Sequence, residues 1–193
     1  MGALHYAILT SLDGYIADAA GNFDWAEPQE DVHRFINKLE KENSVFLLGK
    51  NMYQILRVWE NLPDREALPD YIQEYEGVWK KARKIVYSAS LTSVDTSQTS
   101  LRRSFDKNEI ADLKRKEKNT IGIGGAALAS QALFFELIDE IYLFTFPVLI
   151  GSGKKWITTE KALRLKLLDA VEFASGIYMT HYKVLYANKE SRA

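Results

Sequence analysis

Apolar runs of strand length that alternate with amphipathic segments constrain the fold of this chain more than any other feature of its sequence. Apolar residues recur at helical spacing from about residue 29 to residue 42. Short apolar runs with the length of buried strands occupy residues 5–9, 44–49, 84–88 and 120–124. Strands that alternate with helices predict parallel strands joined by helical crossovers, which places the chain in the α/β class.

The rest of the chain completes this order. Helices are predicted over residues 50–60, 71–82, 106–117 and 126–138, and Asp106 is the candidate N-cap of the third. The polar passage 88–104 is a loop with at most one short strand. After residue 138 the apolar residues recur with the period of strands. A long strand is predicted over 139–151, and a hairpin over 162–186 with its turn near Ser175-Gly176. We therefore expect three layers, a mixed and mostly parallel sheet with helices on both faces, in a single domain over residues 1–193.

The composition excludes several classes of partner. Lys and Arg number 25 against 26 acidic residues, so no net field draws the protein to nucleic acid or to an anionic membrane. No cysteine is present, which excludes a disulfide framework, a thiolate nucleophile and a cysteine-based zinc site. No window of about 18 apolar residues suggests a membrane span. A small-molecule substrate and a cytoplasmic location are therefore expected.

Small or polar residues follow several predicted strands at their carboxyl ends. They are the loop from Ser11 to Ile16, the pair Gly49-Lys50, Ser88, and the segment 122–129. In an open α/β sheet, ligands bind beyond the carboxyl ends of the parallel strands. These four segments are therefore expected to converge on one ligand site.

Gly124 and Gly125 lie between a predicted strand and a predicted helix. Without a Cβ atom, backbone N–H groups can approach a phosphate closely, and a helix N-terminus favours its negative charge, so a pyrophosphate would fit there. The alternative is a tight turn without a ligand. The segment is not the dinucleotide fingerprint, because Ala127 replaces its third glycine and no acidic residue follows at the required distance. "GSGKK" (151–155) lacks the spacing of a phosphate loop and is interpreted as a turn that closes a strand.

Lys50 directly follows Gly49 at the predicted start of a helix. A cation at this position opposes the helix dipole, so nothing local favours it, whereas an anion bound nearby would. Together with Ser88 at an adjacent strand end, Lys50 could recognise a ribose 2′-phosphate and so select NADPH over NADH. The alternative is a solvated lysine.

The three histidines show no spacing typical of a metal site. His5 lies in a predicted strand, His33 is predicted on the outer surface of its helix, and His181 lies in the hairpin. We expect each to be structural, and no metal ligand is assigned.

Four segments together resemble the dihydrofolate reductase superfamily, and within it the branch of the C-terminal reductase domain of riboflavin biosynthesis. They are, in order and spacing, "SLDGYIAD", "LLGKNMY", "KIVYSASL" and "IGIGGAALASQALFFELIDEIYLFTFPVLIGSGKKWI". The resemblance covers about Leu4 to Tyr186, and its last segment is the most specific. It implies a dihydrofolate reductase-like fold, whose mixed sheet is parallel except at one edge.

The resemblance also implies NADPH as the hydride donor, lying across the strand ends. The adenosine side and its 2′-phosphate would meet Gly49, Lys50, Asn51 and Met52. The adenine ribose would be flanked by Ser88 and Leu91. The nicotinamide pocket would be lined by Ala7, Ile8 and Ile16. The pyrophosphate and nicotinamide side would be wrapped by Gly124, Gly125, Ala126, Ala127 and Leu128.

On the substrate side, Trp25, Pro28 and Glu30 follow the W-x-x-P-x-acid order of true dihydrofolate reductases. The resemblance implies that Glu30 holds the amino and ring nitrogens of the substrate and aids its protonation, with Trp25 and Asp13 as further candidate catalytic residues. The riboflavin branch commonly lacks this acid, and the alternative for Glu30 is a solvated acidic first turn of the helix. The alternative for Asp13 is a turn residue.

These features predict an NADPH-dependent oxidoreductase that reduces a small heterocycle, pterin-like or aminopyrimidine-like, as in dihydrofolate or riboflavin-precursor reduction. The protein would hold the cofactor and the substrate in position and provide a water-poor pocket for hydride transfer. Two alternatives stay open: a nucleotide-binding protein without turnover, and an interaction protein. The apolar alternation of "IYMTHYKVLY" suggests a strand face covered by a second subunit, so a homodimer is expected.

Overall fold

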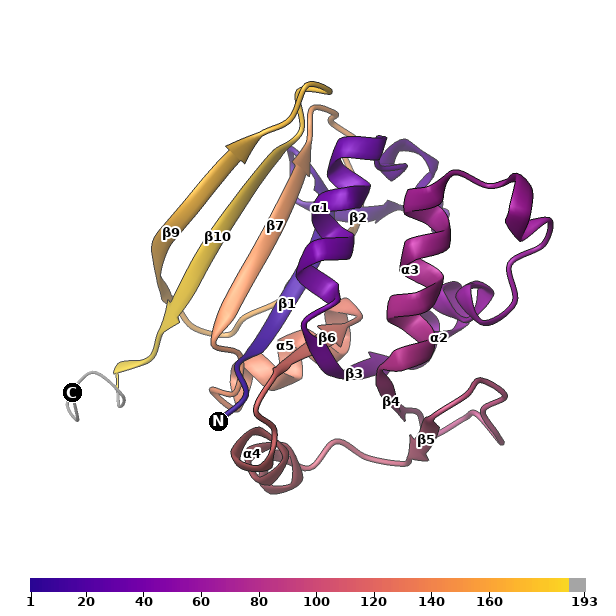
Figure 1. Ribbon diagram of the computed structural model, residues 1–193. Helices are drawn as coiled ribbons and strands as arrows, with labels where there is room; N and C mark the ends of the chain where they lie inside the picture. The colour runs from indigo at the N-terminus through magenta and orange to yellow at the C-terminus, as the bar shows by residue number, and fades with distance from the viewer. Residues whose placement is uncertain (188–193) are drawn as a thin grey trace.

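The computed structural model describes residues 1–187 (Figure 1). Its strands are β1 (Leu4–Ser11), β2 (Tyr15–Asp18), β3 (Asn43–Gly49), β4 (Arg83–Tyr87), β5 (Thr99–Arg102), β6 (Thr120–Gly124), β7 (Glu140–Phe146), β8 (Gly153–Lys155), β9 (Arg164–Glu172) and β10 (Tyr178–Leu185). Its α-helices are α1 (Glu30–Glu40), α2 (Lys50–Leu56), α3 (Asp70–Lys81), α4 (Lys107–Lys116) and α5 (Ala126–Phe134). Short 3-10 helices are η1 (Asp24–Ala26), η2 (Arg57–Glu60) and η3 (Arg65–Ala67).

One eight-stranded sheet in the order β5-β4-β3-β6-β1-β7-β10-β9 forms the centre of the molecule. All pairs from β5 to β7 are parallel, whereas β10 pairs antiparallel with both β7 and β9. This confirms the predicted mixed, mostly parallel sheet. The helix N-cap predicted at Asp106 is also confirmed, because its side chain accepts a hydrogen bond from the backbone N–H of Asn108 at 2.8 Å.

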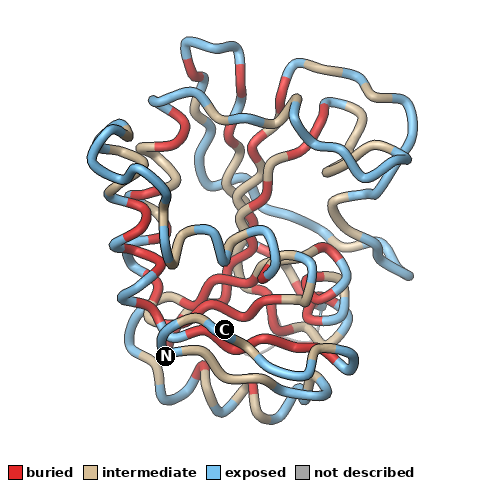
Figure 2. The backbone as a smooth tube through the Cα atoms, turned by 90° about the vertical axis from the view of Figure 1, so that its right-hand side faces the viewer, coloured by how far each residue is buried: buried red, intermediate tan, exposed pale blue. Residues whose placement is uncertain are grey.

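Helices cover both faces of the sheet, as predicted. One face packs against α4 and α5, which contribute Ile110 and Leu128 to a core cluster with Tyr6 and Ile8 of β1. The other face packs against α1, α2 and α3, and the α1 and α3 helices lie side by side over it (Figure 1). Buried residues follow the strands through the middle of the molecule, and exposed residues follow the outer loops (Figure 2).

The segment after β7 differs from the prediction. The strand predicted over 139–151 ends at Phe146, since Pro147 has no N–H to continue the ladder, and the helix predicted to 138 ends at Phe134. "GSGKK" is more than a turn, because its last three residues form β8 and pair with β2 in a separate two-stranded sheet. Gly153 has a φ of +147°, and a Cβ atom there would lie 2.0 Å from the carbonyl oxygen of Ala17, so only glycine fits.

The prediction that His33 lies on the outer surface of its helix is wrong. The side of α1 that carries His33 is covered by α3 and η2, and the residue is only 8% exposed. Its ring centroid lies 5.9, 5.2 and 5.8 Å from those of Trp59, Tyr71 and Tyr75. Burial lowers the pKa of His33, which favours a neutral ring in this aromatic layer.

Candidate active site

The carboxyl ends of β4, β3, β6 and β1 lie next to one another, because these strands are consecutive neighbours in the sheet. The four segments selected from the sequence therefore meet at one edge. Gly49, the last residue of β3, lies beside Gly124 and Gly125 at the end of β6. A Cβ atom on Gly49 would lie 3.8 Å from the carbonyl oxygen of Gly124, and one on Gly125 would lie 3.6 Å from the backbone nitrogen of Gly49.

The start of α5 has the properties of an anion site. Gly125 is its N-cap residue, with φ at +104°, and no side chain caps the N-terminus. The N–H groups of the first turn, at Ala126, Ala127 and Leu128, are therefore left without a capping side chain on the shared strand edge. Met52 of α2 packs beside both glycines and forms one wall of this cradle. The positive end of the helix dipole and the absent Cβ atoms suit the pyrophosphate of a dinucleotide.

The loop after β4 carries the second group of predicted residues. The Ser88 hydroxyl oxygen accepts hydrogen bonds from the backbone N–H groups of Ser90 at 3.2 Å and Leu91 at 3.0 Å. The Lys50 Nζ atom donates to the Ser90 hydroxyl at 3.0 Å. The structure thus brings Lys50, Ser88 and Leu91 together, while Asn51 lies exposed on α2.

Arg103 is a residue of this group that the sequence analysis missed. Its guanidinium donates to the carbonyl oxygens of Leu91 and, at 3.4 Å, Ser88, and its side chain is otherwise exposed. It follows β5, which pairs in parallel with β4, so its strand end belongs to the same edge. No local signal in the polar passage singles it out, because its place depends on the pairing of β5 with β4. Lys50 at the start of α2 and Arg103 after β5 both contact the loop after β4, so this end of the edge has two cations, the chemistry that a phosphomonoester requires.

The three residues predicted for the nicotinamide pocket do not lie together. Ile8 and Ile16 belong to the core cluster on the α5 side of the sheet. Ala7 lies on the opposite face with Trp25, because consecutive residues of a strand point to opposite faces. Their roles stay predictions, and Ala7 would have to act from the α1 side.

Asp13 fastens the loop after β1 to the segment after β7. The Ser11 hydroxyl donates to its carboxylate at 2.6 Å, and the backbone N–H groups of Ile150 and Gly151 donate to it at 3.2 and 2.7 Å. The Ser11 hydrogen bond, with smaller contributions from the two N–H groups, holds the pKa of Asp13 below its usual value. Its carboxylate is thus engaged in holding two loops at the strand edge, which fits the turn-residue alternative.

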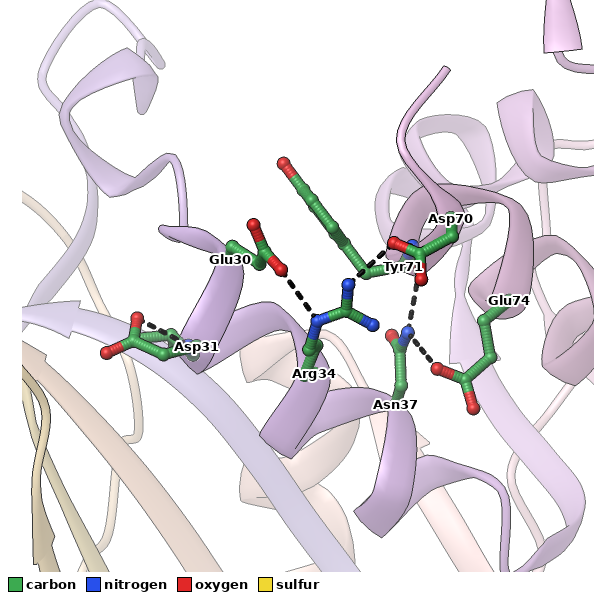
Figure 3. A network of polar contacts seen from close by, with 8 residues as sticks. Glu30, Asp31, Arg34, Asn37, Asp70, Tyr71 and Glu74 are labelled. Atoms are coloured by element: carbon green, nitrogen blue, oxygen red, sulfur yellow. Dashed lines mark hydrogen bonds and ion pairs between the residues drawn. The ribbon is translucent and has the colours of Figure 1, made fainter. Parts of the chain in front are cut away.

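Glu30 and Trp25 lie beyond the same edge of the sheet, near the end of β7. The Trp25 ring meets Phe146 edge-to-face at 6.0 Å, and its buried indole N–H has no hydrogen-bond partner within residues 1–187. Glu30 opens α1 and accepts from Arg34 Nε at 2.8 Å, and Arg34 also donates to Asp70 at 2.6 Å (Figure 3). This pairing lowers the pKa of Asp70 and raises that of Arg34.

An open hollow of about 660 Å³ lies beside this network. It is lined by Gln29, Glu30, Asp31, Arg34, Ala174 and Ser175. Asp31 closes one side, since its carboxylate accepts from the backbone N–H groups of Val32 and Ala174 at 2.8 and 3.3 Å. Arg34 is already engaged by two carboxylates, so the hollow offers mainly hydrogen-bond acceptors to a ligand.

Other site types find no support in the part of the chain that the structure describes. Among residues 1–187, no group of three His, Asp or Glu side chains could hold a metal ion. None of the helices formed by these residues is long and apolar enough to cross a membrane.

Comparison with known proteins gives matches over most of the chain. The model of the RibD C-terminal domain family matches residues 3–179. The uncharacterized protein YyaP of Bacillus subtilis (strain 168) is 25% identical over 179 residues, which cover 91% of each chain.

Solved structures show the same fold. A protein described as a candidate riboflavin biosynthesis protein from Shewanella sp. PV-4 has a TM-score of 0.75 at 24% identity, covering 95% of this chain and 99% of its own. The diaminohydroxyphosphoribosylaminopyrimidine deaminase/5-amino-6-(5-phosphoribosylamino)uracil reductase of Thermotoga maritima has a TM-score of 0.66 at 16% identity, covering 95% and 57%. Dihydrofolate reductase from Enterococcus faecalis, complexed with NADP(H), has a TM-score of 0.60 at 13% identity, covering 95% of both chains.

Proposed function

The chain belongs to the RibD C-terminal domain family, and we propose that it is a reductase that uses NADPH to reduce a small heterocyclic compound, pterin-like or aminopyrimidine-like. The observation that carries this proposal is the uncapped N-terminus of α5 behind Gly124 and Gly125, with Lys50 and Arg103 both bonded to the loop after β4 at the same strand edge. The names of the reductases with the same fold support the reaction type.

The residues at the strand edge fit this cofactor. The first turn of α5, from Ala126 to Leu128, would hold the pyrophosphate through backbone N–H groups. Lys50 and Arg103 would bind the 2′-phosphate, which NADH lacks, and Ser88 would shape the loop that carries both contacts. When bound, NADPH supplies the hydride.

The hollow beside α1 is the proposed substrate site. Reduction of a C=N bond requires a proton on nitrogen as well as a hydride on carbon. Glu30 keeps one carboxylate oxygen free of Arg34, and that oxygen can accept an N–H of an aminopyrimidine edge. Trp25 does not line the hollow, so its buried indole N–H, which has no partner within residues 1–187, would contribute through a bridging water rather than by direct contact with the substrate.

The alternative is a protein of the same fold that binds NADP without turnover, favoured by the exposure and ion pairing of Glu30. The variant Glu30→Gln separates the two. It keeps the size of the side chain but removes the charge that accepts hydrogen bonds and handles the proton. The matched control is Glu27→Gln, because Glu27 is an exposed acidic residue three positions before Glu30 and does not line the hollow.

The test measures NADPH consumption with a panel of dihydropterins and aminopyrimidines, together with NADPH affinity by calorimetry. We expect turnover of at least one compound by the wild type, a loss of about a hundredfold or more in kcat for Glu30→Gln, and unchanged turnover for Glu27→Gln. Both variants should keep the wild-type NADPH affinity. NADPH binding without turnover of any compound would favour the non-catalytic alternative, and full turnover by Glu30→Gln would refute the role of its carboxylate.

A further inference from the structure

The loop that joins β4 to β5, residues 88–98, contains no helix or strand. Near its start it is bonded to both cations assigned to the 2′-phosphate, because Lys50 donates to the Ser90 hydroxyl and Arg103 donates to the carbonyl oxygen of Leu91. A segment without regular secondary structure lacks a ladder of backbone hydrogen bonds. Its shape therefore depends on side chains that reach it from other elements.

Tyr53 of α2 holds the second half of this loop. Its hydroxyl donates a hydrogen bond to the carboxylate of Asp95 at 2.8 Å and accepts one from the backbone N–H of Asp95 at 3.0 Å. The Thr96 hydroxyl donates to the same oxygen at 3.4 Å. One phenol group thus contacts both the backbone and the side chains of two consecutive loop residues.

The ring of Tyr53 is fixed by packing. It is only 2% exposed and belongs to a core cluster with Phe46 and Trp79. Leu91 and Val94 of the loop are partly buried against the same cluster. A side chain that its neighbours hold in place presents its hydroxyl at a fixed position. The loop is therefore attached to Tyr53 by apolar contacts as well as by hydrogen bonds.

The attachments of the loop to α2 lie on one side of the helix. Lys50, Tyr53 and Arg57 follow one another at spacings of three and four residues, which places them on the same helical face. Arg57 pairs with the carboxylate of Asp95 at 3.0 Å. This face thus holds the loop at two points, Ser90 through Lys50 and Asp95 through Tyr53 and Arg57.

From these contacts we propose that Tyr53 is a positioning residue for NADPH. Its hydroxyl holds the 88–98 loop, before the cofactor binds, in the shape in which Lys50 and Arg103 meet the 2′-phosphate. This inference rests on the proposed function. A loop that is already ordered loses less conformational entropy on binding, so its attachment contributes to NADPH affinity. NADH lacks the 2′-phosphate and depends little on the loop, so Tyr53 contributes to the selectivity between the two nucleotides.

Tyr53→Phe tests the proposal, because it removes the hydroxyl and keeps the ring. The matched control is Tyr186→Phe, since Tyr186 is 3% exposed and its hydroxyl donates to the carbonyl oxygen of Ile138 at 2.9 Å. In calorimetry, Tyr53→Phe should bind NADPH about five- to tenfold more weakly and NADH within about twofold of the wild type. Tyr186→Phe also loses a buried hydrogen bond and should destabilise the fold, but it should bind both nucleotides within about twofold of the wild type.

Hydrogen exchange of the protein without cofactor gives a second readout. Amides of the 88–98 loop, that of Asp95 above all, should exchange about tenfold or more faster in Tyr53→Phe and at the wild-type rate in Tyr186→Phe. Circular dichroism and thermal unfolding check that each variant is folded.

Asp95 provides a pair of surface variants that carries the test if Tyr53→Phe does not fold. Its side chain is 59% exposed, so its replacement leaves the core intact. Asp95→Ala removes the acceptor of the Tyr53 hydroxyl and should weaken NADPH binding about threefold or more. Asp95→Asn keeps an acceptor and gives up only an exposed ion pair, so it should bind NADPH within about twofold of the wild type.

The outcomes separate this inference from the proposed function. If the wild type binds NADPH and Tyr53→Phe binds it as tightly as Tyr186→Phe does, the inference alone is overturned. Equal losses of NADPH and NADH affinity in Tyr53→Phe, or unchanged exchange of the loop amides, would overturn it as well. A wild type that binds no NADPH would overturn the proposed function together with the inference.

Discussion

Replacing Gly125 by alanine tests whether the cradle at the start of α5 depends on glycine for its backbone conformation. Gly125 has φ and ψ angles of 104° and 121°, a region that residues with a Cβ atom rarely adopt. The space around it is not the obstacle, because a Cβ atom would lie no closer than 3.6 Å to its neighbours. The cost of Gly125→Ala is therefore backbone strain.

The structure offers a matched control in Gly49. Both glycines are N-cap residues, Gly49 of α2 and Gly125 of α5, and both face the shared strand edge. Gly49 has φ and ψ angles of −72° and 158°, which any residue adopts, and a Cβ atom there would meet its neighbours at 3.8 Å. The two substitutions thus share the loss of a favoured N-cap residue and differ in strain.

We expect Gly125→Ala to lower the free energy of unfolding by about 2 kcal/mol, and the melting temperature by about 4–8 °C. Gly49→Ala should change stability by less than about 0.5 kcal/mol, since the gain from a less flexible unfolded chain offsets the weaker cap. Urea unfolding followed by tryptophan emission measures both. Equal stability of the two variants would refute the reasoning, because it would mean that α5 begins in a conformation open to alanine.

Two further predictions concern the loops around the strand edge. Asp13→Asn removes a carboxyl group whose pKa is lowered in the folded protein. Such a group stabilises the fold fully when the pH is above its ordinary pKa of 3.8, and this stabilisation is lost as the pH falls through the pKa of the folded protein. The difference in urea midpoint between the wild type and Asp13→Asn should therefore be constant above about pH 5 and shrink in more acidic solution. Lys50→Ala and Arg103→Ala should each weaken NADPH binding about tenfold or more in calorimetry and leave NADH binding unchanged. Arg102→Ala, whose guanidinium pairs with Glu109 at 3.2 Å, is the control; an equal loss there would contradict a specific phosphate contact.

The sequence predicted the fold well where periodicity is strong. The segment around Ile121 and Ile123 is apolar because β6 is buried on both sides, and this made its strand and the glycines after it easy to find. The resemblance to the dihydrofolate reductase superfamily and its riboflavin branch is confirmed. The proximity of Lys50 to the loop after β4 was also expected, because parallel neighbours end at the same edge, but its hydrogen bond to Ser90 was not.

Features that depend on tertiary contacts were missed. The β2–β8 pair has strands of four and three residues, too short for an alternating pattern to be recognised. Arg103 gained its place from the pairing of β5 with β4, which no local signal in the Ser/Thr-rich passage reveals. His33 is buried because α3 packs beside α1, and the helical period of α1 alone cannot indicate a second covering layer.

The central claim, that the glycine pair and the two cations form an NADPH site, is tested most directly by titrating the purified protein with NADPH and NADH in parallel. Quenching of tryptophan emission would follow binding, and calorimetry would confirm its stoichiometry. We expect saturable NADPH binding with NADH at least about tenfold weaker, because NADH lacks the phosphate that Lys50 and Arg103 would contact. No saturable binding of either nucleotide, or equal affinity for both, would contradict it.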